Sequence, residues 1–217
     1  MITRFLVFVN IIAFLWEASI AGPGTFTMLG SDSLLPVLQR GALWPDAVLI
    51  NHQYWRIVTA AFLHGSLMHI FVNMISLWSL GRFIEYIAGP VRMALIYGIS
   101  LVISGIGVVL WSAHGVPTLG ASGAIFGLFG ALFAIGFKLG KPGMQLVRDN
   151  LGILILNLII TFTVPAISWQ AHVSGLAAGF IVTLFIYYPP KRIAPAVVDA
   201  ATGDSYETEY QAPPQHQ

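Results

Sequence analysis

Long runs of apolar residues, broken by few charges, constrain this chain more than any other feature. Hydrophobic residues make up 57% of its 217 residues and charged residues only 9%, whereas soluble domains carry about 25% charged residues. So few charges cannot cover a water-facing surface, and the sequence therefore predicts an all-α protein that crosses a membrane several times. The net charge of +1 gives no sign of nucleic-acid binding, and a chain without cysteine has no disulfide or thiolate chemistry.

Six stretches are apolar enough to be membrane spans, each of which needs about 20 residues. They cover residues 5–21, 62–87, 91–113, 121–139, 151–164 and 171–188. The first stretch resembles a signal peptide, but its length and the five spans that follow it favour a retained helix. The sequence therefore predicts a six-helix membrane domain over residues 1–190.

The ten Lys and Arg residues divide unevenly between the two sides of this predicted bundle. Arg40 and Arg56 fall on one side, and the other eight fall on the opposite side. Because Lys and Arg accumulate in cytoplasmic loops, both chain termini are predicted to be cytoplasmic.

Two segments outside the spans have their own composition. Residues 22–61 contain Trp44, Tyr54 and Trp55, and such amphipathic aromatic residues prefer the membrane interface. We expect an interfacial outer loop there, with an unstructured loop as the alternative. Residues 191–217 carry acidic residues and prolines with few large apolar groups, which predicts a disordered cytoplasmic tail.

Four polar residues stand out inside the spans, because polar groups in a membrane are costly and usually functional. His69 and Asn73 are four residues apart in the second span, so they share one helical face. Ser122 begins the fourth span and His172 begins the sixth. Spans two, four and six run in the same direction, so the four groups are predicted to share one depth near the outer surface.

These four residues can supply the nucleophile, the base and the hydrogen-bond donors that acyl transfer requires. A serine hydroxyl requires a base, and His172 can take the proton of Ser122 and return it to a leaving amine. The side chains of His69 and Asn73, with the backbone N–H of Ser122, can donate to an oxyanion. No acidic residue lies at this depth, so we expect a Ser–His dyad. Phe126, one turn after Ser122, could stack on the imidazole, although an ordinary core aromatic is the alternative.

Glycines lie near both Ser122 and His172 in the sequence. They are Gly120, Gly123, Gly127, Gly175 and Gly179. Small residues allow membrane helices to approach closely, so spans four and six can bring Ser122 to His172. Gly120 leaves the preceding loop free to turn the N–H of Ser122 toward a substrate. Helix packing alone would also explain these glycines.

Two other kinds of site are open to a chain with polar residues in its spans. A zinc centre could use the imidazoles of His64, His69 and His172, but no H-E-x-x-H motif or nearby carboxylate accompanies them. His64 is expected to point elsewhere on the helix than His69 and is as readily a structural histidine. A transporter would place polar groups near the midplane of inverted repeats, and no such repeat is visible. We therefore predict neither a metal nor a cofactor.

With these residues in view, the sequence resembles the rhomboid family of intramembrane serine proteases, in its minimal six-helix bacterial form. The motifs that carry the resemblance are Trp55-Arg56, His64-x4-His69-x3-Asn73, Glu85, Gly120-x-Ser122-Gly123 and Ala171-His172-x2-Gly175-x3-Gly179. They extend over most of the chain in a single order.

The resemblance implies that Ser122 is the nucleophile, that His172 is the general base, and that the donors named above form the oxyanion site. Arg56 and Glu85 would be structural, stabilising the outer loop and the inner end of the bundle. Phe126 stands where some members carry tyrosine, so a stacking role is kept and a hydroxyl is lost.

The resemblance also implies that the protein cleaves transmembrane segments of other membrane proteins. Its partners would be substrate transmembrane helices and the lipid bilayer, and its site would face the outer side of a bacterial inner membrane. Substrate would enter between spans two and five. A substrate helix hides its amide bonds and must unwind locally, which favours Gly, Pro or polar residues. The alternative is a non-catalytic rhomboid-like protein that binds or escorts transmembrane helices.

Overall fold

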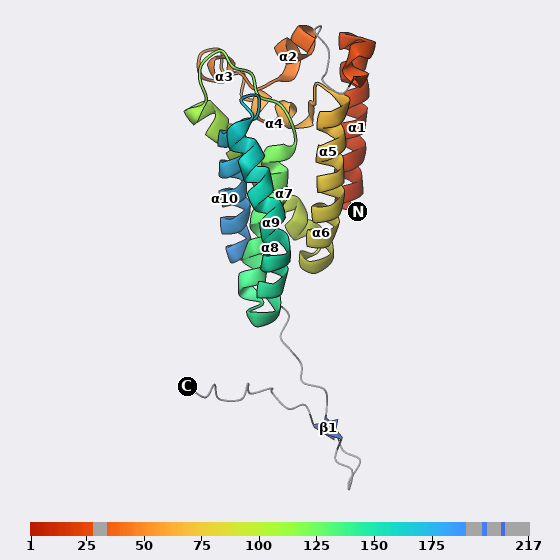
Figure 1. Ribbon diagram of the computed structural model, residues 1–217, viewed down its shortest axis with the longest axis vertical. Helices are drawn as coiled ribbons and strands as arrows, with labels where there is room; N and C mark the ends of the chain where they lie inside the picture. Colours follow the sequence, from red (N-terminus) through yellow and green to blue (C-terminus); the bar gives the residue numbers. More distant parts are fainter. Residues whose placement is uncertain (28–33, 190–196, 199–204, 207–217) are drawn as a thin grey trace. The chain divides into compact units, whose positions relative to one another are not determined.

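Long helices form a bundle over Met1–Tyr187, the first of two units in the chain (Figure 1). The computed structural model describes residues 1–27, 34–189, 197–198 and 205–206. The long helices are α1 (Ile2–Ala21), α5 (Leu67–Ser76), which continues through the π turn η4 (Leu77–Gly81) into α6 (Arg82–Ala88), α7 (Pro90–Trp111), α8 (Ser122–Lys138), α9 (Lys141–Thr163) and α10 (Trp169–Ile186).

Five helical segments are long and apolar enough to cross a membrane, at residues 2–21, 67–88, 90–111, 141–163 and 169–186. The sixth, α8, has only 17 residues, and most of its side chains are buried. A helix of this length extends about 25 Å, less than a hydrocarbon core of about 30 Å. Because the other helices surround α8, it need not reach both faces of the bilayer. The predicted class, an all-α multi-pass membrane protein, is confirmed.

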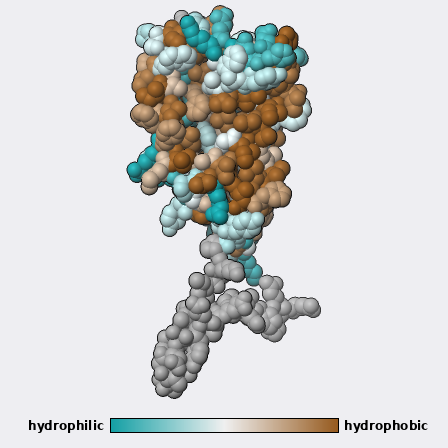
Figure 2. Space-filling view, turned by 180° about the vertical axis from the view of Figure 1, so that it is seen from behind, coloured by the Kyte–Doolittle hydropathy of each residue, from teal (hydrophilic) through white to brown (hydrophobic). Residues whose placement is uncertain are grey.

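The surface of the bundle agrees with a membrane environment. Hydrophobic side chains cover the middle of the face seen in Figure 2, and hydrophilic side chains gather at the end that carries α2 to α4. Large apolar side chains are exposed along the long helices, among them Phe8, Phe71, Leu156 and Phe185. In water such a surface would drive association, whereas in lipid it contacts acyl chains.

The connection between α1 and α5 is largely helical. Its described elements are η1 (Pro23–Phe26), α2 (Leu35–Gly41), α3 (Pro45–Leu49), α4 (Arg56–Thr59) and η3 (Ala60–Phe62). We call the end of the bundle that carries them the α2–α4 end (top of Figure 1). The side chains of Tyr54 and Trp55 are exposed there. An interfacial position suits them, and it remains a prediction.

Two predicted span boundaries are wrong, for local reasons. The second span begins at Leu67 and not at residue 62, because Gly65 has a positive φ of 64° and Ser66 caps the helix by accepting the N–H of His69 at 3.2 Å. His64 therefore lies in the turn before α5. The fifth span begins at Lys141, ten residues before the predicted start at residue 151. Polar residues in its first turns, among them Lys141, Gln145 and Arg148, lower the local hydropathy, so hydropathy alone does not detect the start of this helix.

The predicted disordered tail at residues 191–217 lies largely outside the described residues. Within it the structure describes β1 (Val197–Val198) and β2 (Ser205–Tyr206), which pair as antiparallel strands. The disorder of the remaining residues stays a prediction.

Helices α8 and α10 touch backbone to backbone, and glycines make this contact possible. A Cβ added to Gly175 would collide with the carbonyl of Gly123, and one added to Gly179 would collide with the backbone of Gly127. A Cβ added to Gly127 would also collide with the side chain of Ser100 in α7. These glycines therefore set the separation of the two helices, as small residues do in membrane proteins.

Gly179→Ala tests this contact. The added methyl group has to push apart two helix backbones, so we expect a loss of about 1–3 kcal/mol in the free energy of unfolding, measured by denaturation in detergent micelles. The control is Gly98→Ala on α7, where an added Cβ meets no atom within 4 Å and no loss is expected. Equal stability of the two variants would contradict the proposed packing.

Candidate active site

Ser122 and His172 lie next to each other at the α2–α4 end of the bundle. Ser122 is the first residue of α8, and His172 lies in the first turn of α10, whose N-terminus Ser168 caps. The Nε2 atom of His172 is 2.7 Å from the Oγ atom of Ser122. This separation is within the hydrogen-bond reach that a serine nucleophile and its base require.

The imidazole of His172 is held on two sides. The ring of Phe126 stacks on it with centroids 4.1 Å apart and planes inclined by 14°. The other ring nitrogen, Nδ1, lies 2.7 Å from the hydroxyl oxygen of Thr161, a residue of α9. The exposed fraction of His172 is 7% and that of Thr161 is 3%. Thr161 was not among the site residues predicted from the sequence, although it continues the spacing of the buried residues Val147 and Leu154 along α9.

His69 and Asn73 lie on one face of α5, as their spacing predicts. The Nδ1 atom of His69 is 2.7 Å from the carbonyl oxygen of His64. A carbonyl only accepts, so Nδ1 carries the proton, and the neutral ring then has no proton on Nε2. Nε2 can donate to an oxyanion only when the ring is doubly protonated. Asn73 donates one amide N–H to the carbonyl of His69 at 2.9 Å and keeps a second N–H.

His64 does not point away from His69, as its spacing on a continuous helix suggested. The ring centroids of the two residues are 5.1 Å apart in an edge-on arrangement, because His64 lies in the turn before α5. Its side chain is 1% exposed, and its Nδ1 atom is 3.2 Å from the carbonyl of Phe62. These contacts support a structural role behind His69.

Glu17 of α1 holds the turn that contains His64. Its carboxylate accepts the backbone N–H of His64 at 2.9 Å and that of Gly65 at 2.9 Å, and its side chain is fully buried. Glu17 was not among the site residues predicted from the sequence, because the prediction considered carboxylates only as partners of His172. The signal was present, since Glu17 is the one charged residue in the predicted first span, residues 5–21.

The loop that leads to Ser122 is tied to the α1–α5 connection. Leu43 and Thr118 exchange backbone hydrogen bonds of 2.9 Å, and the N–H of Gly120 donates to the carbonyl of Ala60 at 2.9 Å. Gly120 has a φ of 121°, and a Cβ there would lie 2.8 Å from the ring of His69. Glycine is therefore required at this position both for the backbone turn and for the approach of His69.

Arg56 cross-links the connection itself. Its guanidinium donates to the carbonyls of Gln39 at 2.6 Å and Ala42 at 2.8 Å, and to the side chain of Gln53 at 2.6 Å. It also lies 5.9 Å from the ring centroid of Trp55. The contacts agree with a stabilising role in this segment, and none of them involves Ser122.

Glu85 lies at the opposite end of the bundle. Its carboxylate accepts the backbone N–H of Ile2 at 2.8 Å and of Thr3 at 3.1 Å, and the hydroxyl of Thr3 at 2.7 Å. It thereby satisfies the first N–H groups of α1, which have no partner within the helix.

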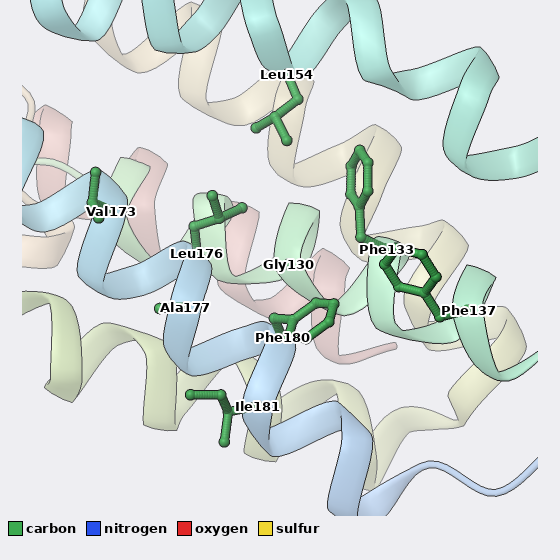
Figure 3. A pocket seen from close by; sticks show the side chains of 9 residues that line it. All are labelled: Gly130, Phe133, Phe137, Leu154, Val173, Leu176, Ala177, Phe180 and Ile181. Atoms are coloured by element: carbon green, nitrogen blue, oxygen red, sulfur yellow. The ribbon is translucent and has the colours of Figure 1, made fainter. Parts of the chain in front are cut away.

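A cavity of about 410 Å³ lies between α8, α9 and α10, away from the Ser122–His172 pair. Figure 3 shows Leu154 of α9 on one side of it and residues of α8 and α10, such as Phe133 and Leu176, on the other. The lining is apolar. The cavity shows that α9 is not packed tightly against α8 and α10 along its whole length.

The fold and this site define a class of protein, a multi-pass helical membrane protein with a serine and a histidine paired below one end of its bundle. Comparison with known proteins identifies the family. The profile of the Rhomboid domain matches residues 51–189, and the chain therefore belongs to the rhomboid family.

Named relatives include rhomboid proteases. The chain is 31% identical over 159 residues to Rhomboid protease GluP of Bacillus subtilis, covering 70% of this chain and 31% of GluP. It is 30% identical over 157 residues to Putative rhomboid protease YdcA of the same organism, covering 69% of this chain and 79% of YdcA. It is also 30% identical over 167 residues to Inactive RHOMBOID-like protein 8 of Arabidopsis thaliana, covering 76% of this chain and 47% of that protein. The chain spans less than two thirds of the length of GluP and of Inactive RHOMBOID-like protein 8, and its relatives include proteases and a protein named inactive.

Glu17→Leu tests the support of the turn before α5. The substitution leaves two buried backbone N–H groups without acceptors, so the free energy of unfolding is expected to fall by about 2 kcal/mol or more. Glu17→Gln keeps one acceptor oxygen and should lose less. Denaturation of both variants in detergent measures the difference, and a leucine variant as stable as wild type would contradict this role.

Proposed function

We propose that this protein is an intramembrane serine endopeptidase that cleaves transmembrane segments of membrane proteins through Ser122 and His172. The observation that carries the proposal is the 2.7 Å separation of Ser122 Oγ and His172 Nε2, within a chain of the rhomboid family. A pair kept only for helix packing would not need an imidazole nitrogen directed at a hydroxyl.

The reaction follows from the protonation states of the two groups. His172 Nε2 accepts the hydroxyl proton as Ser122 Oγ attacks the carbonyl carbon of the scissile peptide bond. The imidazolium then donates that proton to the leaving amine, which leaves an acyl-enzyme on Ser122. Water, deprotonated by His172, hydrolyses the ester and restores the hydroxyl.

The developing oxyanion requires donors aimed at its position. The backbone N–H of Ser122 begins α8 and has no partner within the helix, and Asn73 has a free amide N–H. We propose these two as the standing donors. His69 joins them through Nε2 when its ring carries a second proton, because Nδ1 is already committed to the carbonyl of His64.

The water that the reaction needs would come from the side of the membrane that the α2–α4 end faces. The excess of Lys and Arg at the other end supports a cytoplasmic position for both termini and an outward-facing site. For a bacterial protein this corresponds to the outer face of the inner membrane.

A second function is a rhomboid-like protein that binds or escorts transmembrane helices without cleaving them. One relative at 30% identity is named inactive, so membership in the family does not by itself imply catalysis. The short contact between Ser122 and His172 favours the enzyme over this alternative.

Cleavage in proteoliposomes tests the proposal. Wild-type protein should cut a single-span substrate with a Gly-rich outer end, and Ser122→Ala and His172→Ala should each lower the rate by about 10³-fold or more. Gel analysis of the fragments measures the rates. Cleavage that persists in Ser122→Ala would exclude this nucleophile, and a wild type that binds but does not cut the substrate would support the escort function.

Substrate preference should follow the instability of the substrate helix. The peptide carbonyls within a membrane helix are hydrogen-bonded except in its last turn, so a scissile bond inside the helix is exposed only after local unwinding. Substrates with Gly or Pro near the outer end should be cut faster than a matched poly-Leu segment. Equal rates for the two, compared in the same vesicles, would show that helix instability does not control selection.

A further inference from the structure

The hydroxyl of Thr161 joins two groups at once. Its Oγ1 lies 2.7 Å from the carbonyl oxygen of Asn157, one turn earlier in α9, and 2.7 Å from Nδ1 of His172 in α10. Threonine in a helix commonly donates to the carbonyl four residues before it. Because Thr161 and His172 are both buried, solvent does not compete for these bonds.

The number of available protons determines which group donates in the hydrogen bond between Thr161 and His172. A hydroxyl has one proton, and the carbonyl of Asn157 can only accept it. Thr161 therefore has only a lone pair left for His172, so Nδ1 must carry the proton. A neutral imidazole has one N–H, which leaves Nε2 unprotonated and able to accept the proton of Ser122. This is the tautomer that a general base requires.

We propose that Thr161 is the positioning residue of the Ser122–His172 pair, filling the place that a carboxylate takes in a catalytic triad. The inference rests on the proposed function, since it assigns a role toward the same reaction. The hydroxyl of Thr161 is bonded to Asn157 and His172 and not to the nucleophile Ser122. It acts through His172, by fixing its tautomer and its ring orientation together with the stacked ring of Phe126.

A neutral partner suits this buried site. When His172 takes the proton of Ser122, Nδ1–H remains bonded to Thr161, so the imidazolium keeps a partner on that side. A carboxylate would stabilise the imidazolium more strongly, but an unpaired charge at this depth is expensive to bury. A threonine satisfies Nδ1 without adding a charge when the pair is at rest.

Thr161 occupies a position of α9 where the sequence pattern favours an apolar residue. The buried residues of α9 are Gly143, Val147, Leu154 and Thr161. Val147, Leu154 and Thr161 recur at intervals of seven and form one stripe facing the bundle. A leucine or valine would continue this stripe at residue 161, whereas a hydroxyl there has its partner in His172.

Thr161→Val tests the proposal, since valine keeps the shape and removes the hydroxyl. We expect kcat for substrate cleavage to fall about 10- to 100-fold with KM unchanged, when rates are normalised to the amount of folded protein. Thr161→Ser restores the hydroxyl and should recover most of the rate. A variant that only disturbed packing would lose folded protein instead, and serine would not restore kcat.

The matched control is Thr163→Val. Thr163 makes the same bond within α9, to the carbonyl of Ile159 at 2.8 Å, but its side chain is exposed. This variant should cleave at the wild-type rate. A wild-type rate in Thr161→Val would overturn the role of Thr161 while leaving the proposed function intact. Undiminished cleavage by Ser122→Ala would overturn both.

A measurement on the wild-type protein does not depend on any variant of Thr161. ¹⁵N spectra of histidine-labelled protein in micelles, with His172→Ala used to assign the signals of that residue, report which ring nitrogen carries the proton. We expect protonated Nδ1 and bare Nε2 at neutral pH. The opposite tautomer would overturn the proposal even if Thr161→Val failed to fold.

Discussion

The backbone contact between α8 and α10 is the constraint on which the rest of this structure depends. Ser122 and His172 belong to different helices, fifty residues apart in the sequence, and a hydrogen bond of 2.7 Å between them tolerates little error. Gly123 meets Gly175 and Gly127 meets Gly179 with no side chain between the helices. One methyl group at this crossing would move the first turns of α8 and α10 apart, so the packing glycines and the proposed chemistry are parts of one arrangement.

Around that crossing, other residues hold in place the turn and the loop that surround Ser122 and His172. Glu17 holds the turn before α5, and Gly120 is bonded to the carbonyl of Ala60, so His69 and the loop before Ser122 meet in one place. Arg56 stabilises the helical connection from which Ala60 follows. In lipid, burial of apolar surface distinguishes poorly between one helix arrangement and another, so polar contacts of this kind carry much of the specificity.

The sequence predicted the parts of this structure that follow from composition and from spacing. Hydropathy located the spans, and the spacing of His69 and Asn73 placed them on one helix face. The start of α5 was missed, because hydropathy does not detect the turn at Gly65 or the cap at Ser66. Thr161 was missed for another reason. A threonine in an apolar helix is ordinary in a sequence, and only the three-dimensional packing of α9 on α10 reveals that its hydroxyl meets His172.

Reaction with a serine-directed fluorophosphonate, mapped by mass spectrometry, tests the central claim most directly. The proposed pair predicts one adduct, on Ser122, because among the serines that the structure describes Ser122 is the one whose hydroxyl lies within hydrogen-bond distance of an imidazole nitrogen. The adduct should disappear in His172→Ala while the protein stays folded. An adduct on another serine, no adduct in the wild type, or equal labelling of Ser122 with and without His172 would contradict the account.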